Sequence, residues 1–424
     1  MTPELLKRLI ADQNTDLIMP NNYIQRTAEH SLTRFSQNKE IIILTGVRRC
    51  GKSVLLQQVR HLQAESDFYF NFEDERLIQF TVADFQLLQE VFIELFGLQQ
   101  TYYFDEIQNI EGWELFVRRL YNSGNKIYIT GSNAALFSEE LGTRLTGRYI
   151  TLKIFPLSFY ECLQANDPEL LQKKIWSTIE IGLIKKQFKH YCQLGGFPGY
   201  VQYQQPEYLH SLYESILYRD IIARYKIMQS KPLKELVFFL ASNCSKEMTY
   251  NALRKLLGIG SASTVSDYCG YLENSHLCLF VNRYHESVKV QIQSPKKIYF
   301  IDHVLAKHIG FRFSDDMGRI LENIVCIELK RRHYDIYYHR ENKECDFIVR
   351  QQNTIVCAIQ VCKDLSDPIT KAREVDGLLE ALKRYSLDEG VILTENEEEV
   401  FTVTEQKDYK IKVIPIWKWL LNYS

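Results

Sequence analysis

The chain has 424 residues, of which 46% are hydrophobic, and its 51 basic and 53 acidic side chains leave a formal charge of -2 at pH 7. The length predicts two or three domains, and the balanced charge argues against a global affinity for nucleic acid or membranes, so any such surface has to be local. Ten singly spaced cysteines argue against a disulfide framework or a zinc site, and the absence of a signal peptide and of an apolar stretch of membrane-spanning length predicts a cytoplasmic protein without membrane contacts.

Residues 1–37 are predicted to form an amphipathic helical segment. Short apolar runs follow it, and helical patterns such as "SVLLQQVRHLQA" separate several of them. This alternation predicts an α/β fold in which helices cover both faces of a parallel sheet. The apolar runs cover residues 40–45, 67–72, 100–106, 125–132 and 148–155.

The stretch "GVRRCGKS" follows the first apolar run and opens a helix. It matches the pattern G-x-x-x-x-G-K-[ST] in full, and the strand before it and the helix after it are the context that this pattern requires. An ordinary glycine-containing turn is the less favoured alternative. We therefore predict an ATP site in which Lys52 reaches the β- and γ-phosphates and the Ser53 hydroxyl binds Mg²⁺. The predicted nucleotide-binding residues are Gly46, Val47, Arg48, Arg49, Cys50, Gly51, Lys52 and Ser53, with Arg48 and Arg49 as charge near the nucleotide rather than chemistry.

Carboxylates are expected at the end of a neighbouring strand. "TYYFDEIQ" supplies Asp105 to hold Mg²⁺ through water and Glu106 to polarise the attacking water, whereas the same pair in isolation is usually a solvated turn. A further strand ends in "ITGSN", which places Ser132 and Asn133 near the γ-phosphate. Asn133 is predicted to sense phosphate and help to orient water, and a polar strand cap is the open alternative.

These motifs, together with "NFEDER", "LTGRY" and "FPLSFYE", resemble AAA-type ATPases of bacteria and archaea in which a C-terminal domain of unknown function, similar to PD-(D/E)xK nucleases, follows the ATPase. The resemblance extends to "GGFPGY" (195–200), "YRDIIARY" (218–225), "KIYFID" (297–302) and "GRILENIVCIELKRR" (318–332), and so spans almost the whole chain.

The resemblance implies a core sheet of strand order 5-1-4-3-2, a helical lid, a winged-helix unit and a nuclease-like domain. The corresponding boundaries are 1–37 for the N-terminal helical segment, 38–155 for the P-loop ATPase core, 156–230 for the lid, 231–295 for the winged-helix-like unit and 296–424 for the nuclease-like domain. In related ATPases an arginine from a neighbouring subunit completes the site. Arg148 is the candidate here, ahead of Arg144, and a structural surface arginine is the equal alternative.

A helix-turn-helix is predicted at 249–274, with a wing-like strand after it. Its second helix, "SASTVSDYCGYLE", carries no Arg or Lys, whereas a helix that reads DNA usually brings such side chains to bases and phosphates. We therefore favour structural packing for this unit. Phosphate contacts from nearby cations stay open, and the candidates are Arg254, Lys255, Lys289, Lys296 and Lys297.

The nuclease pattern requires a helix Glu, a strand Asp and then Glu/Gln-x-Lys on the next strand, all converging on Mg²⁺. Glu322, Asp346 and Gln360 occupy the first three places, but Cys362 stands at the place of the lysine. Lys363 comes one residue later and is expected to point away, because side chains alternate along a strand. A vestigial site without nuclease activity is therefore expected.

Two functions are consistent with these features. The first is a switch or motor component that hydrolyses Mg·ATP to move its lid and C-terminal domains. The alternative is an ATP-gated protein that binds or cuts nucleic acid through its C-terminal domain. DNA or RNA and a second copy of the chain stay open as partners.

Overall fold

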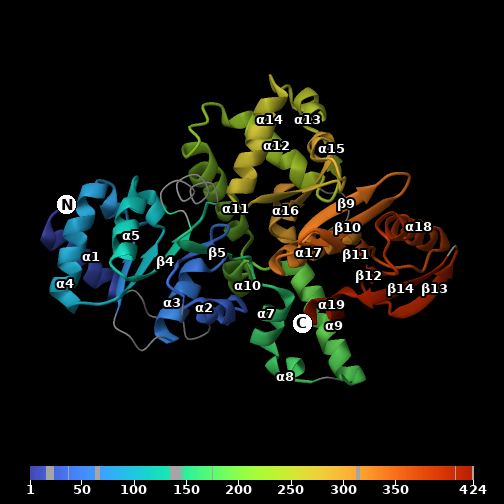
Figure 1. The fold of residues 1–424 in the computed structure, drawn as a ribbon, viewed down its shortest axis with the longest axis horizontal. Coiled ribbons are helices and arrows are strands. Elements are labelled where there is room, and N and C mark those ends of the chain that lie inside the picture. The colour runs from blue at the N-terminus through green and yellow to red at the C-terminus, as the bar shows by residue number, and fades with distance from the viewer. Residues whose placement is uncertain are drawn as a thin grey trace. The chain divides into compact units, whose positions relative to one another are not determined.

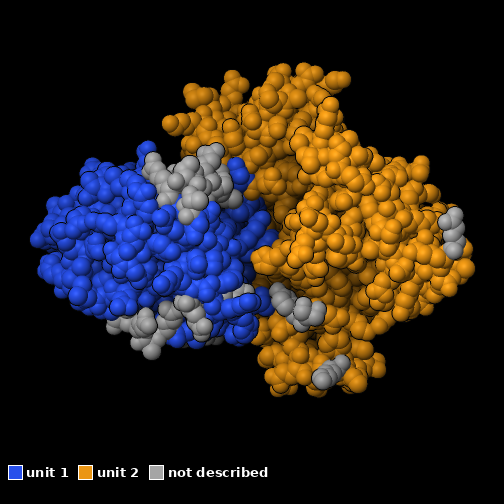
Figure 2. Space-filling model, in the orientation of Figure 1, with its two compact units in different colours: residues 1–155, 274–276 blue, residues 156–273, 277–424 orange. Residues whose placement is uncertain are grey.

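The computed structural model describes residues 1–15, 23–36, 38–62, 67–133, 145, 147–173, 175–311, 316–405 and 407–422. The chain is traced from its N-terminus to its C-terminus in Figure 1. It divides into two compact units, which Figure 2 shows in blue and orange. Unit 1 consists of Met1–Phe155 with the tripeptide Asn274–His276, and unit 2 consists of Pro156–Glu273 with Leu277–Ser424.

Unit 1 is built on a parallel sheet with strand order β2-β3-β4-β1-β5. This confirms the predicted α/β fold and the predicted order 5-1-4-3-2, which is the same order counted from the other edge. The strands are β1 (Ile41–Thr45), β2 (Phe68–Asn71), β3 (Thr101–Asp105), β4 (Lys126–Gly131) and β5 (Tyr149–Lys153), and the helices are α1 (Pro3–Thr15), α2 (Ala28–Ser36), α3 (Lys52–Leu62), α4 (Phe85–Phe96) and α5 (Trp113–Asn122).

Strand β1 is buried along its whole length because helices cover both of its faces. Ile41 and Ile43 pack into the hydrophobic core that α1, α4 and α5 share. Ile42 and Leu44 point to the opposite face, because successive side chains alternate, and α3 contacts the sheet at β3 and β4. The chain therefore leaves the carboxyl end of β1 and turns directly into α3.

Unit 2 begins with a helical stretch. Its elements are α7 (Phe159–Asn166), α8 (Pro168–Leu171), α9 (Thr178–Leu194), α10 (Pro198–Tyr203), α11 (Pro206–Ser215), a π-helical segment (Ile216–Ala223) and α12 (Ser230–Ser242). Two of these helices begin with a capping box, in which Ser158 pairs with Glu161 and Ser177 pairs with Glu180. The serine side chains satisfy backbone N–H groups that the first helical turn leaves without partners.

A small antiparallel sheet of order β6-β8-β7 follows, with two helices before its longer strands. The elements are β6 (Glu247–Met248), α13 (Tyr250–Leu257), α14 (Ala262–Asn274), β7 (Cys278–Asn282), α15 (Val288–Gln293), β8 (Lys296–Phe300) and α16 (His303–Ile309). Thr249 caps α13, and Gly258 ends it with φ +63°. The interpretation of this region as a winged helix stays a prediction.

The C-terminal sheet has the order β13-β14-β12-β11-β10-β9 and mixes parallel and antiparallel pairs. Residues of α17 and α19 share a core with one face of this sheet, and α18 shares a core with the other face. The elements are α17 (Met317–Arg331), β9 (Asp335–Arg340), β10 (Glu344–Gln351), β11 (Thr354–Val361), α18 (Pro368–Tyr385), β12 (Glu389–Thr394), β13 (Glu399–Thr404), β14 (Asp408–Pro415) and α19 (Ile416–Leu421). Among the described residues, no helix combines the length and the apolar composition that crossing a membrane requires.

Candidate functional site

The loop Gly46–Gly51 joins the carboxyl end of β1 to the first turn of α3. A Cβ atom on Gly46 would lie 2.1 Å from the Ile154 carbonyl oxygen, so only glycine fits where the loop passes the end of β5. Cys50 is buried beneath the loop, and its Sγ donates to the same carbonyl oxygen at 3.4 Å. Burial raises the pKa of this thiol. Cys50 therefore packs under the loop as a neutral group.

The Lys52 side chain folds back over the loop. Its Nζ donates to the carbonyl oxygens of Gly46 at 3.1 Å and Val47 at 3.2 Å. The same nitrogen lies 3.6 Å from Glu106 Oε1, and the lysine side chain is only 4% exposed. This places the ammonium group at the carboxyl edge of the sheet, between the loop and the end of β3.

Ser53 and Asp105 meet beside this lysine. Ser53 Oγ donates to Asp105 Oδ1 at 3.1 Å, and Thr130 of β4 donates to the same oxygen. Burial, reinforced by the neighbouring Glu106 carboxylate, raises the pKa of Asp105 to about 6. A hydroxyl and a carboxylate held together in this way fit a Mg²⁺ ion, which takes oxygen ligands and keeps several waters.

Glu106 follows the last residue of β3 with a left-handed backbone, φ 53°. Its N–H donates to Thr130 Oγ1 at 3.0 Å, which fixes this turn against β4. Its Oε2 accepts hydrogen bonds from Gln108 Nε2 and from Ser132 Oγ, the latter at 3.3 Å. Asn133 is fully buried next to Ser132. The structure thus brings Glu106 and the end of β4 to the same edge of the sheet as the loop.

The arginines predicted for this region lie in three different settings. Arg48 Nη1 forms an ion pair with Glu73 Oε1 at 2.6 Å, and Arg49 has a left-handed backbone, φ 64°. Arg148 lies at the amino ends of the strands, opposite to the loop, because it precedes Tyr149, which pairs with Ile41 at the start of β1. Ile41 and Gly46 are five residues apart, and at about 3.3 Å per residue this places the amino end of β1 about 16 Å from the loop. Arg148 is therefore not brought to the loop of its own chain, and Arg144 lies outside the described residues.

Two residues that support the loop were missed by the sequence analysis. Arg26 is buried and donates to the Cys50 carbonyl oxygen at 2.8 Å and to the Phe155 carbonyl oxygen at 2.6 Å. His276 Nε2 lies 2.9 Å from Oγ1 of Thr45, the residue that precedes the loop. Neither residue lies in a recognisable motif, so no signal in one sequence could have found them.

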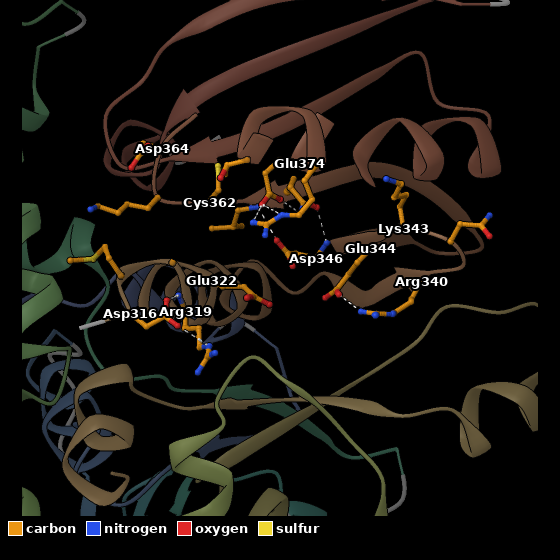
Figure 3. Close-up of a pocket in the computed structure, with 18 residues that line it drawn as sticks. Asp316, Arg319, Glu322, Arg340, Lys343, Glu344, Asp346, Cys362, Asp364 and Glu374 are labelled. Carbon is orange, nitrogen blue, oxygen red and sulfur yellow. Dashed lines mark hydrogen bonds and ion pairs between the residues drawn. The ribbon is translucent and has the colours of Figure 1, made fainter. Parts of the chain in front are cut away.

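The C-terminal residues Glu322, Asp346 and Gln360 come together in unit 2. They line a cavity of about 940 Å³, called the C-terminal cavity below, and Figure 3 shows Glu322 on a helix near Glu344 and Asp346 on a strand. Gln360 Oε1 accepts the Asp346 N–H at 3.2 Å. Cys362 is buried and lines this cavity.

One lysine prediction needs correction. Lys297 was a candidate for phosphate contacts, but its side chain is only 2% exposed and its Nζ contacts Glu322 Oε1 at 3.0 Å and Asp346 Oδ1 at 2.8 Å. The prediction failed because a lysine is rarely buried, and the carboxylates that pair with this one are distant in sequence. Lys363 is exposed and lines the C-terminal cavity, and its expected orientation away from the metal position stays a prediction.

The two candidate metal sites differ in their fit. Ser53 and Asp105 suit Mg²⁺ because this ion binds through one or two protein oxygens together with waters and phosphates. The carboxylates Glu322 and Asp346 do not fit a metal ion, because the Lys297 ammonium already lies between them. In the part of the chain that is described, no three acidic, His or Cys side chains are arranged to hold a metal ion.

The fold and the loop define a protein with an AAA-type ATP-binding domain, and a family model described as an AAA domain matches residues 38–163. Two models for domains of unknown function, DUF8612 and DUF4143, match residues 185–315 and 317–419. An uncharacterized protein of Methanocaldococcus jannaschii is 33% identical over 99% of this chain and 96% of its own length. Another, from Haemophilus influenzae, is 34% identical over 87% of this chain and 92% of its own length. The chain belongs to the same family as these two relatives, and its residues 38–163 match the AAA domain.

Solved structures are similar at lower identity. A Walker-type ATPase of Pyrococcus abyssi has a TM-score of 0.44 at 15% identity and covers 68% of this chain and 96% of its own. The RuvB Holliday junction branch migration motor of Thermotoga maritima has a TM-score of 0.32 at 13% identity and covers 63% and 93%. Since the C-terminal match is to a domain of unknown function, the nuclease-like interpretation stays a prediction.

Proposed function

We propose that this chain binds Mg·ATP and hydrolyses it, and that this cycle moves the lid (156–230) and the C-terminal domain (296–424), as in a molecular switch or motor component. The observation that supports the proposal best is the meeting of Lys52, Asp105 and Glu106 at one edge of the sheet, where Lys52 Nζ lies 3.6 Å from Glu106 Oε1. A loop that served only as a structural turn would need neither a buried lysine nor a buried carboxylate pair.

In this proposal each side chain has a separate role. Lys52 exchanges its bonds to the loop carbonyls for bonds to the β- and γ-phosphates. Mg²⁺, held by Ser53 and Asp105, neutralises phosphate charge when it is bound. Glu106 orients the attacking water and accepts its proton, and Ser132 and Gln108 hold the carboxylate in place.

The test compares the parent protein with Lys52→Ala, Glu106→Gln and the control Lys39→Ala, which removes an exposed lysine just before β1. ATP affinity is measured by calorimetry and turnover by phosphate release. Lys52→Ala is expected to lose ATP binding because the phosphates lose their cation. Glu106→Gln is expected to keep the affinity while turnover falls by about 10²- to 10³-fold, since water is no longer activated.

Two results would contradict this assignment. One is unchanged ATP affinity in Lys52→Ala, and the other is a parental hydrolysis rate in Glu106→Gln. Lys39→Ala should match the parent in both measurements. This control shows whether the loss of any lysine changes the measurements. Circular dichroism of each variant shows whether it is folded.

A second copy of the chain is the partner that fits Arg148. This arginine lies about 16 Å along the strands from its own loop, so a role at an ATP site requires the loop of a neighbouring chain. The Glu106→Gln protein should accumulate an ATP-bound oligomer, which mass photometry with and without ATP would detect. An ATP-independent monomer would remove this role from Arg148.

A further inference from the structure

Lys297 is the second residue of β8 and one of the most deeply buried charged side chains that the structure describes. Isolated buried charges are strongly unfavourable, so a buried lysine needs anionic partners. Its neighbour Lys296 is half-buried and its Nζ donates to Asn282 Oδ1 instead. Two adjacent lysines of one strand therefore differ in their partners. Only Lys297 contacts the carboxylates of Glu322, Glu344 and Asp346, which are called the acidic centre below.

Three carboxylates from two elements surround the Lys297 ammonium. Its Nζ lies 3.0 Å from Glu322 Oε1 on α17, 2.7 Å from Glu344 Oε1 and 2.8 Å from Asp346 Oδ1 on β10. An ammonium group has three N–H donors, so these three oxygens satisfy it completely. Burial by itself lowers the pKa of Lys297, but the three carboxylates outweigh burial and raise it well above its ordinary value.

Further groups contact the same carboxylates. Tyr299 OH donates to Glu322 Oε1 at 2.6 Å, and Asp346 Oδ2 accepts the Val361 N–H at 3.0 Å. Glu344 also pairs with Arg340 at the cavity wall, where Figure 3 shows the two side chains together. Two cations, Lys297 and Arg340, therefore contact the three carboxylates, and Lys297 contacts all three of them.

A divalent metal would compete for the same position. Mg²⁺ binds carboxylate oxygens at about 2.0–2.1 Å, so it would lie among the oxygens that now surround the Lys297 nitrogen. Two cations so close together would repel each other strongly in a buried setting. A metal can therefore enter this centre only when Lys297 is absent from it.

We propose that Lys297 is the resident cation of the C-terminal domain and replaces the divalent metal that a Glu322–Asp346 carboxylate pair would otherwise bind. The centre thus holds β8, α17 and β10 together through one lysine and functions without a metal. This inference concerns unit 2 alone and stands apart from the ATP site.

The test is Mn²⁺ binding without nucleotide at pH 8, measured by calorimetry and by the shift of the unfolding temperature. The parent should give the same Mn²⁺ titration as Asp346→Asn, because neither has a metal site in the C-terminal domain. Lys297→Met removes the charge and keeps an unbranched side chain that is one atom shorter. It should unfold at a lower temperature than the parent, gain one Mn²⁺ site per chain that the parent lacks, and recover part of the lost unfolding temperature when Mn²⁺ is added.

Three further variants identify the source of any change. Lys296→Met, the same substitution one residue earlier, should bind Mn²⁺ no better than the parent. Lys297→Arg keeps a cation and should also bind none, and Lys297→Met/Asp346→Asn should lose the acquired binding. Mn²⁺ binding by the parent that disappears in Asp346→Asn would overturn the proposal, and this comparison needs no Lys297 variant to fold. A folded Lys297→Met protein that gains no Mn²⁺ binding would overturn it as well.

Discussion

His276 combines a left-handed backbone, φ 58°, with a fully buried imidazole beside the end of β1. Its Nε2 lies 2.9 Å from Thr45 Oγ1. Burial lowers the pKa of His276 well below its usual range, and the positive charges of Lys153 and Lys52 lower it further. The imidazole is therefore neutral in the folded protein at pH values where an unfolded histidine is already protonated.

This state makes the stability of unit 1 sensitive to mild acid. Below about pH 6.5 the unfolded chain takes up a proton at His276 that the folded chain does not, so stability falls as the pH falls. We expect the parent to lose about 1 kcal/mol more than His276→Gln between pH 7.5 and pH 5.5. Hydrogen exchange of a peptide that contains β1, compared between the two proteins at each pH, measures this difference.

His190→Gln is the matched control, since it makes the same substitution at an exposed position of α9 in unit 2. It should leave the exchange of β1 as in the parent at every pH. Parallel pH profiles for the parent and His276→Gln would show that His276 is protonated in the folded state, against the expectation.

Single residues could be predicted where the functional residues are neighbours in the sequence. The loop Gly46–Ser53 and the pair Asp105–Glu106 could be predicted because a short pattern beside an apolar strand carries the signal. Arg26, His276 and Lys297 could not, because each acts on partners far away in the sequence and lies in no pattern of its own. For Lys297 the general preference of lysine for the surface pointed to the wrong setting.

At the scale of elements, α18 packs so closely on β10 that one helical position accepts only glycine. A Cβ atom on Gly377 would lie 2.1 Å from the Glu344 carbonyl oxygen. The clash involves backbone, so the helix itself would have to move. The contact also fixes the part of β10 that carries Glu344 and Asp346.

Gly377→Ala should therefore destabilise unit 2 by about 1–3 kcal/mol, because the added methyl group forces α18 away from the sheet. Gly182→Ala in α9 makes the same change where a Cβ would meet no atom within 4 Å. That variant should be neutral or stabilising by up to about 1 kcal/mol, since alanine favours a helix over glycine. Urea unfolding of the two variants measures both effects, and equal stabilities would refute the close contact.

Two motifs that carry the family resemblance contact each other through a hydrogen bond. Gly196 of "GGFPGY" donates its N–H to Asp302 Oδ2 of "KIYFID" at 2.7 Å. Asp302 also caps α16 by accepting the N–H groups of Val304 and Leu305. One sequence cannot reveal that two motifs meet. The strands after residue 362 were not foreseen. β13 alternates weakly and depends on its sheet partner, whereas β14 alternates between buried and more exposed residues, which is a pattern that the sequence also carries.

For the whole molecule, the two units have separate hydrophobic cores. A nucleotide that binds only the folded loop stabilises unit 1 by mass action, by about 2.7 kcal/mol at 100 times its dissociation constant. If hydrolysis serves a switch, this stabilisation has to be accompanied by a change in unit 2.

Hydrogen exchange with and without Mg·ATP tests this coupling. Peptides from β1, the loop and β3 should exchange up to about 100-fold more slowly with ATP. Peptides from α9 and α10 in the proposed lid should also change in the parent, and both effects should vanish in Lys52→Ala. Slower exchange confined to unit 1 would be consistent with ATP binding but would contradict the proposed switch.

The tripeptide Asn274–His276 also sets an order for synthesis. Unit 1 is complete up to Phe155, yet its last three residues follow about 120 residues later. At about 5–20 residues per second a ribosome needs roughly 6 to 24 s to make that intervening chain. During this interval the nascent chain contains every strand of the ATP-binding sheet, but Thr45 has no His276 to contact. The translation speed through α7–α14 therefore determines how long unit 1 exists without His276.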